Sequence, residues 1–172
     1  MAAAVLLRRR RLPVRIDDSK RLTPRQRERA YHVIRDSADV GVGIVCAESI
    51  DRLNILRATL LAMRCAIADL PHPPELALID GSHTPDAPVP CRAVIGGDHS
   101  CYSISCASII AKVLRDGLMA FYDRLYPGYA LHEHKGYGTP THAKWLRELG
   151  PCFLHRLTYE PVRQSAGARA TG

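Results

Sequence analysis

The sequence contains no long apolar run, no closely spaced cysteine pair and no internal repeat. A transmembrane helix needs roughly 18–20 mostly apolar residues in a row, and no run approaches that length, so we expect no contact with a membrane. The six cysteines include no C-x-x-C pair. This argues against a zinc site or a disulfide framework and favours reduced thiols in a cytoplasmic protein. A G-x-S-x-G turn is also missing, so nothing supports a Ser-His-Asp hydrolase.

The composition is that of a globular domain with a basic surface. Hydrophobic residues make up 47% of the 172-residue chain and charged residues 24%, which is ordinary for a soluble domain. The length suffices for one domain with a buried core. The formal net charge is +7, and such a charge favours an anionic partner, most commonly a nucleic acid.

Two aspartates follow short apolar runs in the middle of the chain. The first apolar run, residues 76–79, is followed directly by Asp80. The second, Val94 and Ile95, is followed by two glycines and then Asp98. Both runs predict short buried strands, and α/β sheets bind ligands at the ends of such strands. Two carboxylates there favour Mg²⁺ or Mn²⁺, which is held by one or two carboxylates plus substrate phosphate. The alternative is structural: Asp80 begins a turn, and Asp98 caps the next helix.

The segment after Asp98 predicts a helix with an apolar stripe and a small-sided first half. Serine, cysteine and alanine fill most of that first half. Small side chains let a helix lie close to a sheet, so we expect this helix to fix the position of Asp98. The apolar residues recur at the helical spacings of three and four: Ile104, Ala107, Ala111, Leu114, Leu118 and Phe121.

The alternation of elements predicts a single α/β layer structure over residues 1–162. Further strands are expected at residues 2–7 and 42–47 because both segments are apolar, and the second is β-branched and flanked by glycine. The small, polar residues 163–172 predict a disordered tail.

Three more helices are expected. Thr23 and Gln26 form a capping box that predicts a helix to about residue 36. A proline after Thr139 predicts a short last helix that ends near residue 149. Asn54 is expected to cap a long helix whose core face carries Leu56, Leu60, Met63 and Ile67.

A polar loop places Tyr137 between two glycines, shortly after Lys135. Such a tyrosine can stack on a sugar or base while the lysine holds a phosphate; the alternative is a tyrosine in a tight turn. His132 and His134 have no ligand-like spacing to cysteine or glutamate, so packed or solvated histidines are favoured over a metal site. The four arginines at residues 8–11 favour a solvated turn, with phosphate contact as the alternative.

Seven stretches, taken together and in order, resemble ribonuclease HII. They are DDSKRLTPRQRE (17–28), IDRLNILRATLLAMRCA (50–66), IDG (79–81), GGD (96–98), SISCASIIAKVLRD (103–116), YPGY (126–129) and HKGYGT (134–139). No single stretch is decisive, but the ordered set is specific. The resemblance implies a ribonuclease H-like α/β fold, a mixed sheet flanked by helices.

The resemblance also implies an activity. Members of this family are endonucleases that hydrolyse the RNA strand of RNA–DNA hybrids and nick duplex DNA 5′ of embedded ribonucleotides. They use two divalent ions, Mg²⁺ or Mn²⁺, at a cluster of four carboxylates, and they leave 3′-hydroxyl and 5′-phosphate ends. We therefore expect a monomer whose partners are RNA–DNA hybrids or ribonucleotide-containing duplex DNA.

The resemblance assigns roles to individual residues as well. Asp80 and Asp98 match two of the family's catalytic, metal-binding aspartates. Asp116 is expected to be structural. The expected substrate-binding residues are Tyr137, which matches a tyrosine that packs at the RNA–DNA junction, with Lys135, Lys20 and Ser19.

The chain departs from the family at its start. The family opens with a strand carrying Asp-Glu-x-Gly-Arg-Gly, which supplies the other two carboxylates, and this sequence does not contain it. In the family that strand pairs with both neighbours, so we expect unpaired edges on the strands at residues 2–7 and 76–79. We also expect weaker metal binding. Gly96 stands where members of the family commonly have a lysine, so one positive charge beside the site is absent. The alternative function is that of a catalytically impaired form that only binds nucleic acid.

Overall fold

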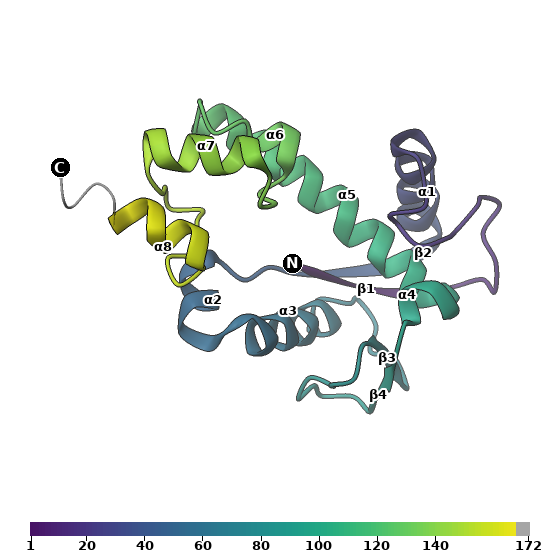
Figure 1. The fold of residues 1–172 in the computed structure, drawn as a ribbon. Helices are drawn as coiled ribbons and strands as arrows, with labels where there is room; N and C mark the ends of the chain where they lie inside the picture. The colour runs from purple at the N-terminus through teal and green to yellow at the C-terminus, as the bar shows by residue number, and fades with distance from the viewer. Residues whose placement is uncertain (168–172) are drawn as a thin grey trace. The chain divides into compact units, whose positions relative to one another are not determined.

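A computed structural model describes residues 1–167 (Figure 1). The chain divides into two compact units. The first unit holds Met1–Val45 and Leu56–Val113; the second holds Cys46–Ile55 and Leu114–Gly172. The sequence predicts one domain over residues 1–162 and does not indicate this division.

The first unit contains two pairs of strands. β1 (Ala2–Leu7) pairs antiparallel with β2 (Ala38–Gly43), in a register that runs from Ala2 opposite Gly43 to Leu7 opposite Ala38. β3 (Ala77–Asp80) pairs parallel with β4 (Cys91–Val94). The strand expected at residues 42–47 therefore lies earlier in the chain than predicted. Ile95, expected in a buried strand, lies beyond β4 and is 84% exposed.

The remaining elements are helices. In the described part of the chain they are α1 (Pro24–Ser37), α2 (Ala47–Leu53), α3 (Ile55–Ala68), α4 (Gly97–Ser100), α5 (Tyr102–Leu125), α6 (Leu131–His134), α7 (Pro140–Leu149) and α8 (Glu160–Gly167). None of them is both long enough and apolar enough to cross a membrane.

Two of the three predicted capping signals, at Thr23 and Thr139, are confirmed, whereas Asn54 is the C-cap of α2. The backbone N–H of Gln26 donates to Thr23 Oγ1 over 3.3 Å, and the N–H of Thr23 donates to Gln26 Oε1 over 3.0 Å. This reciprocal pair begins α1. At α7 the hydroxyl of Thr139 accepts from the N–H of His142. Helix α8 is unexpected, and it includes residues 163–167 of the predicted tail. The rest of that tail, residues 168–172, lies outside the described residues.

Helix α3 turns a different face to the core from the one predicted. Its buried residues are mainly alanines: Ala58, Ala62, Ala66 and Ile67. Leu56 is exposed, and Leu60 and Met63 are half-buried. The cause lies in two glycines of β2. A Cβ at Gly41 would overlap the carbonyl oxygen of Ala66, and a Cβ at Gly43 would overlap the carbonyl oxygen of Ala62. Glycine facing alanine lets helix and strand backbones touch, and this close approach selects the alanine face.

The first half of α5 is also rotated relative to the prediction. Its buried residues are Ile104, Ser105, Cys106, Ile109 and Ile110, so only one residue of the expected stripe is in the core. Ala107 and Ala111 instead line a cavity, together with Ile104. The small side chains still act as expected at Ser105, whose hydroxyl donates to the carbonyl of Asp98 over 2.8 Å.

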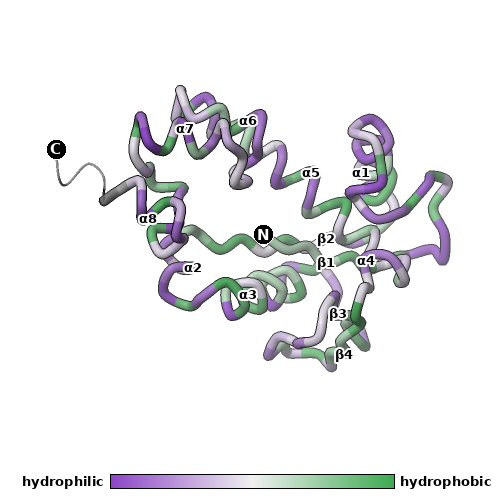
Figure 2. The backbone as a smooth tube through the Cα atoms, viewed as in Figure 1, coloured by the Kyte–Doolittle hydropathy of each residue, from purple (hydrophilic) through white to green (hydrophobic). Residues whose placement is uncertain are grey.

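That cavity, of about 370 Å³, is bounded by every residue of β1 and of β3 and by parts of α3 and α5. Within residues 1–167, β1 pairs only with β2, and β3 only with β4. Most residues of β3 are hydrophobic (Figure 2). Two of them, Ala77 and Ile79, are buried with Ile67 in one apolar cluster. The two strand pairs thus meet through side chains, and the unpaired edges expected on β1 and β3 are present among the described residues.

The charged turn at residues 8–11 is exposed, as expected of a solvated segment. One arginine, Arg8, forms an ion pair with Asp39 of β2, and His72 Nδ1 lies 2.9 Å from the other oxygen of the same carboxylate. The two hydrogen bonds, the one from Arg8 first, hold the pKa of Asp39 below its usual value.

The contact between β2 and α3 predicts a large cost for one methyl group. Gly43→Ala should lower the free energy of unfolding by about 2–3 kcal/mol, because its Cβ would collide with the backbone of Ala62. Gly117→Ala is the matched control: no atom lies within 4 Å of its added Cβ, and alanine should stabilise α5 by about 1 kcal/mol. Chemical denaturation of both variants measures the difference; equal effects would contradict the close packing.

Candidate functional site

Asp80 is the last residue of β3 and is joined to the loop that follows β4. Its Oδ1 accepts the backbone N–H of Gly97 over 2.9 Å. Gly96 has a φ of 64°, a left-handed conformation that glycine adopts at little cost. A Cβ at Gly97 would lie 2.5 Å from Ile104 Cδ1 and 3.3 Å from Asp80 Oδ1. The two glycines therefore allow the loop to pack against Asp80, which brings the next residue, Asp98, to the same end of the sheet.

Asp98 lies inside the short helix α4 and does not cap α5. Its side chain is 18% exposed. One carboxylate oxygen, Oδ2, lies 4.0 Å from Lys20 Nζ, and the other, Oδ1, lies 3.8 Å from His99 Nε2. The carboxylate is thus reachable from solvent and has two cationic or ionisable neighbours.

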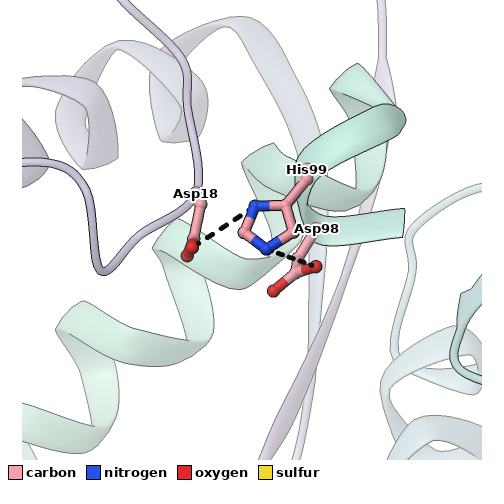
Figure 3. Close-up of side chains that lie close together, drawn as sticks. All are labelled: Asp18, Asp98 and His99. Atoms are coloured by element: carbon pink, nitrogen blue, oxygen red, sulfur yellow. Dashed lines mark ion pairs between the residues drawn. The ribbon is translucent and has the colours of Figure 1, made fainter. Parts of the chain in front are cut away.

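Asp18 completes a cluster that the sequence did not indicate. It is only 4% exposed. Its Oδ1 accepts the N–H of Lys20 over 3.0 Å, and its Oδ2 lies 3.4 Å from His99 Nδ1. Ligand atoms of Asp18, Asp98 and His99 all lie within 4.8 Å of one another, and the imidazole stands between the two carboxylates (Figure 3). The sequence placed Asp18 in a polar loop, and neither its burial nor its approach to His99 has a local signal.

The two carboxylates of this cluster suit a bound cation. Asp18 Oδ2 and Asp98 Oδ1 flank the His99 imidazole at 3.4 Å and 3.8 Å. Carboxylate oxygens with an imidazole nitrogen are also a donor set that suits Mn²⁺, and the carboxylates alone suit Mg²⁺. The residues therefore fit a divalent cation. Asp80 lies outside this group of three and is joined to it through Gly97, the residue before Asp98.

Ser19 and Lys20, both expected near substrate, differ in exposure. Ser19 is buried, and its hydroxyl lies 3.1 Å from that of Ser108 in α5. The guanidinium of Arg27 donates to the carbonyl of Ser19. Lys20 instead extends into solvent beside Asp98, with its side chain 79% exposed. The buried serine thus anchors the segment that presents the lysine.

Tyr137 and Lys135 belong to the second unit. Tyr137 is 56% exposed. Its N–H donates to the carbonyl of His134 over 2.8 Å, and its carbonyl accepts from the N–H of Thr139 over 2.9 Å. The guanidinium carbon of Arg115 lies 4.8 Å from the centre of the Tyr137 ring. The tight turn and the exposed aromatic face are therefore both present, and the ring carries a stacked cation.

The two loop histidines are packed or solvated, as predicted. His132 is exposed, and its Nδ1 lies 2.6 Å from Asp123 Oδ2. His134 is buried, with Nε2 2.7 Å from the carbonyl of Tyr129. Within residues 1–167 neither of them joins a group of metal-ligating side chains.

Comparison with solved structures establishes the fold. The ribonuclease H2 of Pyrococcus horikoshii OT3 has a TM-score of 0.76 at 22% identity, and the match covers 99% of each chain. Bst-RNase HIII in complex with Mn²⁺ has a TM-score of 0.64 at 16% identity, over 90% of this chain and 58% of that one. The protein therefore has the expected ribonuclease H-like α/β fold, with helices flanking a mixed set of strands.

Comparison of sequences goes further than the fold. The family model for ribonuclease HII matches residues 1–162. The ribonuclease HII of Parvibaculum lavamentivorans is 47% identical over 166 residues, which make up 95% of this chain but only 61% of that protein. The match includes the strand ends, the small-residue helix and the tyrosine loop described above. The chain belongs to the ribonuclease HII family.

Proposed function

We propose that this chain is an endonuclease that hydrolyses the RNA strand of RNA–DNA hybrids and cleaves duplex DNA 5′ of embedded ribonucleotides. Membership of the ribonuclease HII family supports this activity, and the net charge of +7 suits a nucleic-acid substrate. The observation that carries the proposal is the cluster of Asp18, Asp98 and His99 at the end of the sheet, next to Asp80. We expect a cytoplasmic monomer.

Asp98, with Asp80, Asp18 or His99, would hold the metal. One neighbour in structure, Bst-RNase HIII, is described in complex with Mn²⁺. Two bound Mg²⁺ or Mn²⁺ ions would supply an activated water and stabilise charge on the departing 3′-oxygen. Asp98 is the residue best placed for this role, since its carboxylate is partly exposed and lies beside both the buried Asp18 and the loop held by Asp80.

Other residues would bind and orient the substrate. Lys20 Nζ, close to Asp98, would contact the phosphate next to the scissile bond. Tyr137 would stack on a sugar or base while Lys135 contacts a phosphate. The 2′-hydroxyl would select the cleavage site, because it alone separates a ribonucleotide from a deoxyribonucleotide. The products would be a 3′-hydroxyl and a 5′-phosphate.

A second candidate function is binding of the same duplexes without cleavage. One observation favours it: among residues 1–167 the cluster contains only two carboxylates, and Asp80 uses one oxygen for the N–H of Gly97. Two carboxylates should hold a divalent ion more weakly than four. Metal-dependent nicking would exclude this alternative, and duplex binding without nicking would establish it.

Asp80→Asn should abolish cleavage but preserve the fold. The asparagine oxygen can still accept the N–H of Gly97, so only the negative charge is lost. On a DNA duplex with one ribonucleotide and Mn²⁺, we expect the rate to fall by about 100-fold or more. Binding of the duplex should be unchanged. Asp36→Asn, on the exposed side of α1, is the control and should cleave normally. Normal cleavage by Asp80→Asn would refute the proposed mechanism.

Asp98→Asn tests the cation site without any substrate. Titration calorimetry with Mn²⁺ should show affinity reduced by about tenfold or more, because one of two carboxylates in the cluster is neutralised. Asp86→Asn is the comparison, since that side chain is fully exposed and 3.9 Å from Arg64. Equal Mn²⁺ affinity in the Asp98 and Asp86 variants would place the ion elsewhere.

A further inference from the structure

Three buried histidines lie together in the second unit and take no part in the cation site. His134, His142 and His155 are 6%, 6% and 8% exposed. The rings of His134 and His142 stack with their centres 4.1 Å apart. His142 Nε2 lies 3.0 Å from His155 Nε2. Two imidazole nitrogens at that distance must share a hydrogen bond, with a proton on one and a lone pair on the other.

The direction of this hydrogen bond follows from its two ends. The backbone N–H of Cys152 donates to His155 Nδ1 over 3.0 Å. His155 therefore carries its proton on Nε2 and donates it to His142 Nε2. His142 must then carry its proton on Nδ1, which lies 2.9 Å from the carbonyl of Tyr137. The carbonyl of Cys152 also lies 3.3 Å from His155 Nδ1, but a proton on Nδ1 would leave the N–H of Cys152 and the carbonyl of Tyr137 each facing the wrong partner. Because a backbone N–H only donates and a carbonyl only accepts, this pair of tautomers alone satisfies the three shorter contacts.

His134 is fixed in the same way but separately. The N–H of Gly136 donates to its Nδ1 over 3.1 Å, and its Nε2 lies 2.7 Å from the carbonyl of Tyr129. His134 is therefore also neutral, with the proton on Nε2. Its carbonyl accepts the N–H of Tyr137. The backbone of Tyr137 is thus held on its N–H side by His134 and on its carbonyl side by His142 and Thr139.

We propose that His142 is a positioning residue for Tyr137 and that His155 sets the tautomer in which the His142 ring can donate to the carbonyl of Tyr137. The line of hydrogen bonds from the N–H of Cys152 through both rings to the carbonyl of Tyr137 fixes the backbone from which the exposed Tyr137 ring projects. It requires two neutral rings in opposite tautomers. The consequence for substrate binding rests on the proposed function, because it assumes that Tyr137 stacks on the nucleic acid.

The surroundings of the rings keep them neutral. Burial lowers the pKa of His142, and burial, followed by the nearby His142, lowers the pKa of His155 to about 4. The titratable side chains that face them are His134, Tyr129 and Cys152, and burial raises the pKa of the Cys152 thiol. The lowered pKa values mean that the neutral rings stabilise the fold above about pH 6.5, and this contribution is lost as the pH falls toward about 4.

Nuclear magnetic resonance of the full chain labelled with ¹⁵N-histidine tests the tautomers directly. We expect His142 protonated on Nδ1 and His155 on Nε2, with both rings neutral from about pH 8 to about pH 6. Single substitutions assign the signals. A charged His142 at neutral pH, or His142 protonated on Nε2, would overturn the proposal. This measurement needs neither substrate nor metal.

Two substitutions of His142 separate positioning from packing. The amide of asparagine falls near the place of Nδ1 and can still donate to the carbonyl of Tyr137, whereas the amide of glutamine falls near Nε2 and cannot. In ¹H–¹⁵N spectra, His142→Gln should shift the amide signals of Tyr137 and Thr139, and His142→Asn should leave them nearly unchanged. His132→Gln, on the exposed side of the same loop, is the control. Equal shifts in the asparagine and glutamine variants would overturn the proposal.

Binding of a short DNA duplex with one ribonucleotide connects the positioning to the proposed function. His142→Gln and Tyr137→Ala should each raise the Kd by about tenfold, while His142→Asn stays near the parent value. If Tyr137→Ala binds normally, Tyr137 is no substrate contact, and the proposed function fails at that residue while the spectra still decide the positioning. If only Tyr137→Ala weakens binding, the function stands and the positioning is refuted.

Discussion

The hydrogen bond between the N–H of Gly97 and Asp80 Oδ1 determines the geometry of the cation site. It joins the end of β3 to the loop after β4, and the parallel pairing of these strands already brings Asp80 opposite Val94. A side chain at Gly97 would collide with Ile104 at the start of α5. Glycine at that position therefore lets the loop pack against Ile104 and Asp80 without moving either side chain, and Asp98 follows directly. The carboxylate of Asp80 thus has a structural task as well as its proposed chemical one.

Asp98 is held from its other side as well. The hydroxyl of Ser105 donates to its carbonyl, and Ser19, in the segment that presents Asp18 and Lys20, contacts Ser108 one helical turn further along α5. Small polar residues on α5 therefore fix two loops that are distant in sequence, at residues 17–20 and 96–99. Larger residues there would separate Asp18 from Asp98 and His99, whose ligand atoms now lie within 4.8 Å. Close packing of the helix is what brings the charges together.

Local signals in the sequence were enough for part of this structure. The capping box at Thr23 and the left-handed turn at Gly96 act within a few residues of themselves, so pattern alone locates them. The face of α3 could not be read in this way, because the glycines of β2 decide it from a distant part of the chain. Asp18 and His99 were missed for the same reason: their meeting depends on how α5 packs. Asp80 and Asp98 were found by their position after strands, and their roles as metal ligands remain predictions.

The separation of β1 from β3 bears on how tightly metal can be held. An isolated pair of strands is marginally stable in water, so both pairs depend on the apolar cluster in which Ala4 and Met63 pack against Ile67, Ala77 and Ile79. Side-chain contacts of this kind set no register, whereas a ladder of hydrogen bonds does. The end of β3, with Asp80, is therefore less rigidly placed relative to β1 than a continuous sheet would make it. A strand that paired with both β1 and β3 would supply such a ladder, and both strands line a cavity of about 370 Å³. The resemblance to ribonuclease HII implies that a strand in this position carries two further carboxylates. The same element would then add rigidity and ligands at once, and for this reason affinity for divalent ions and stability of the fold should rise together.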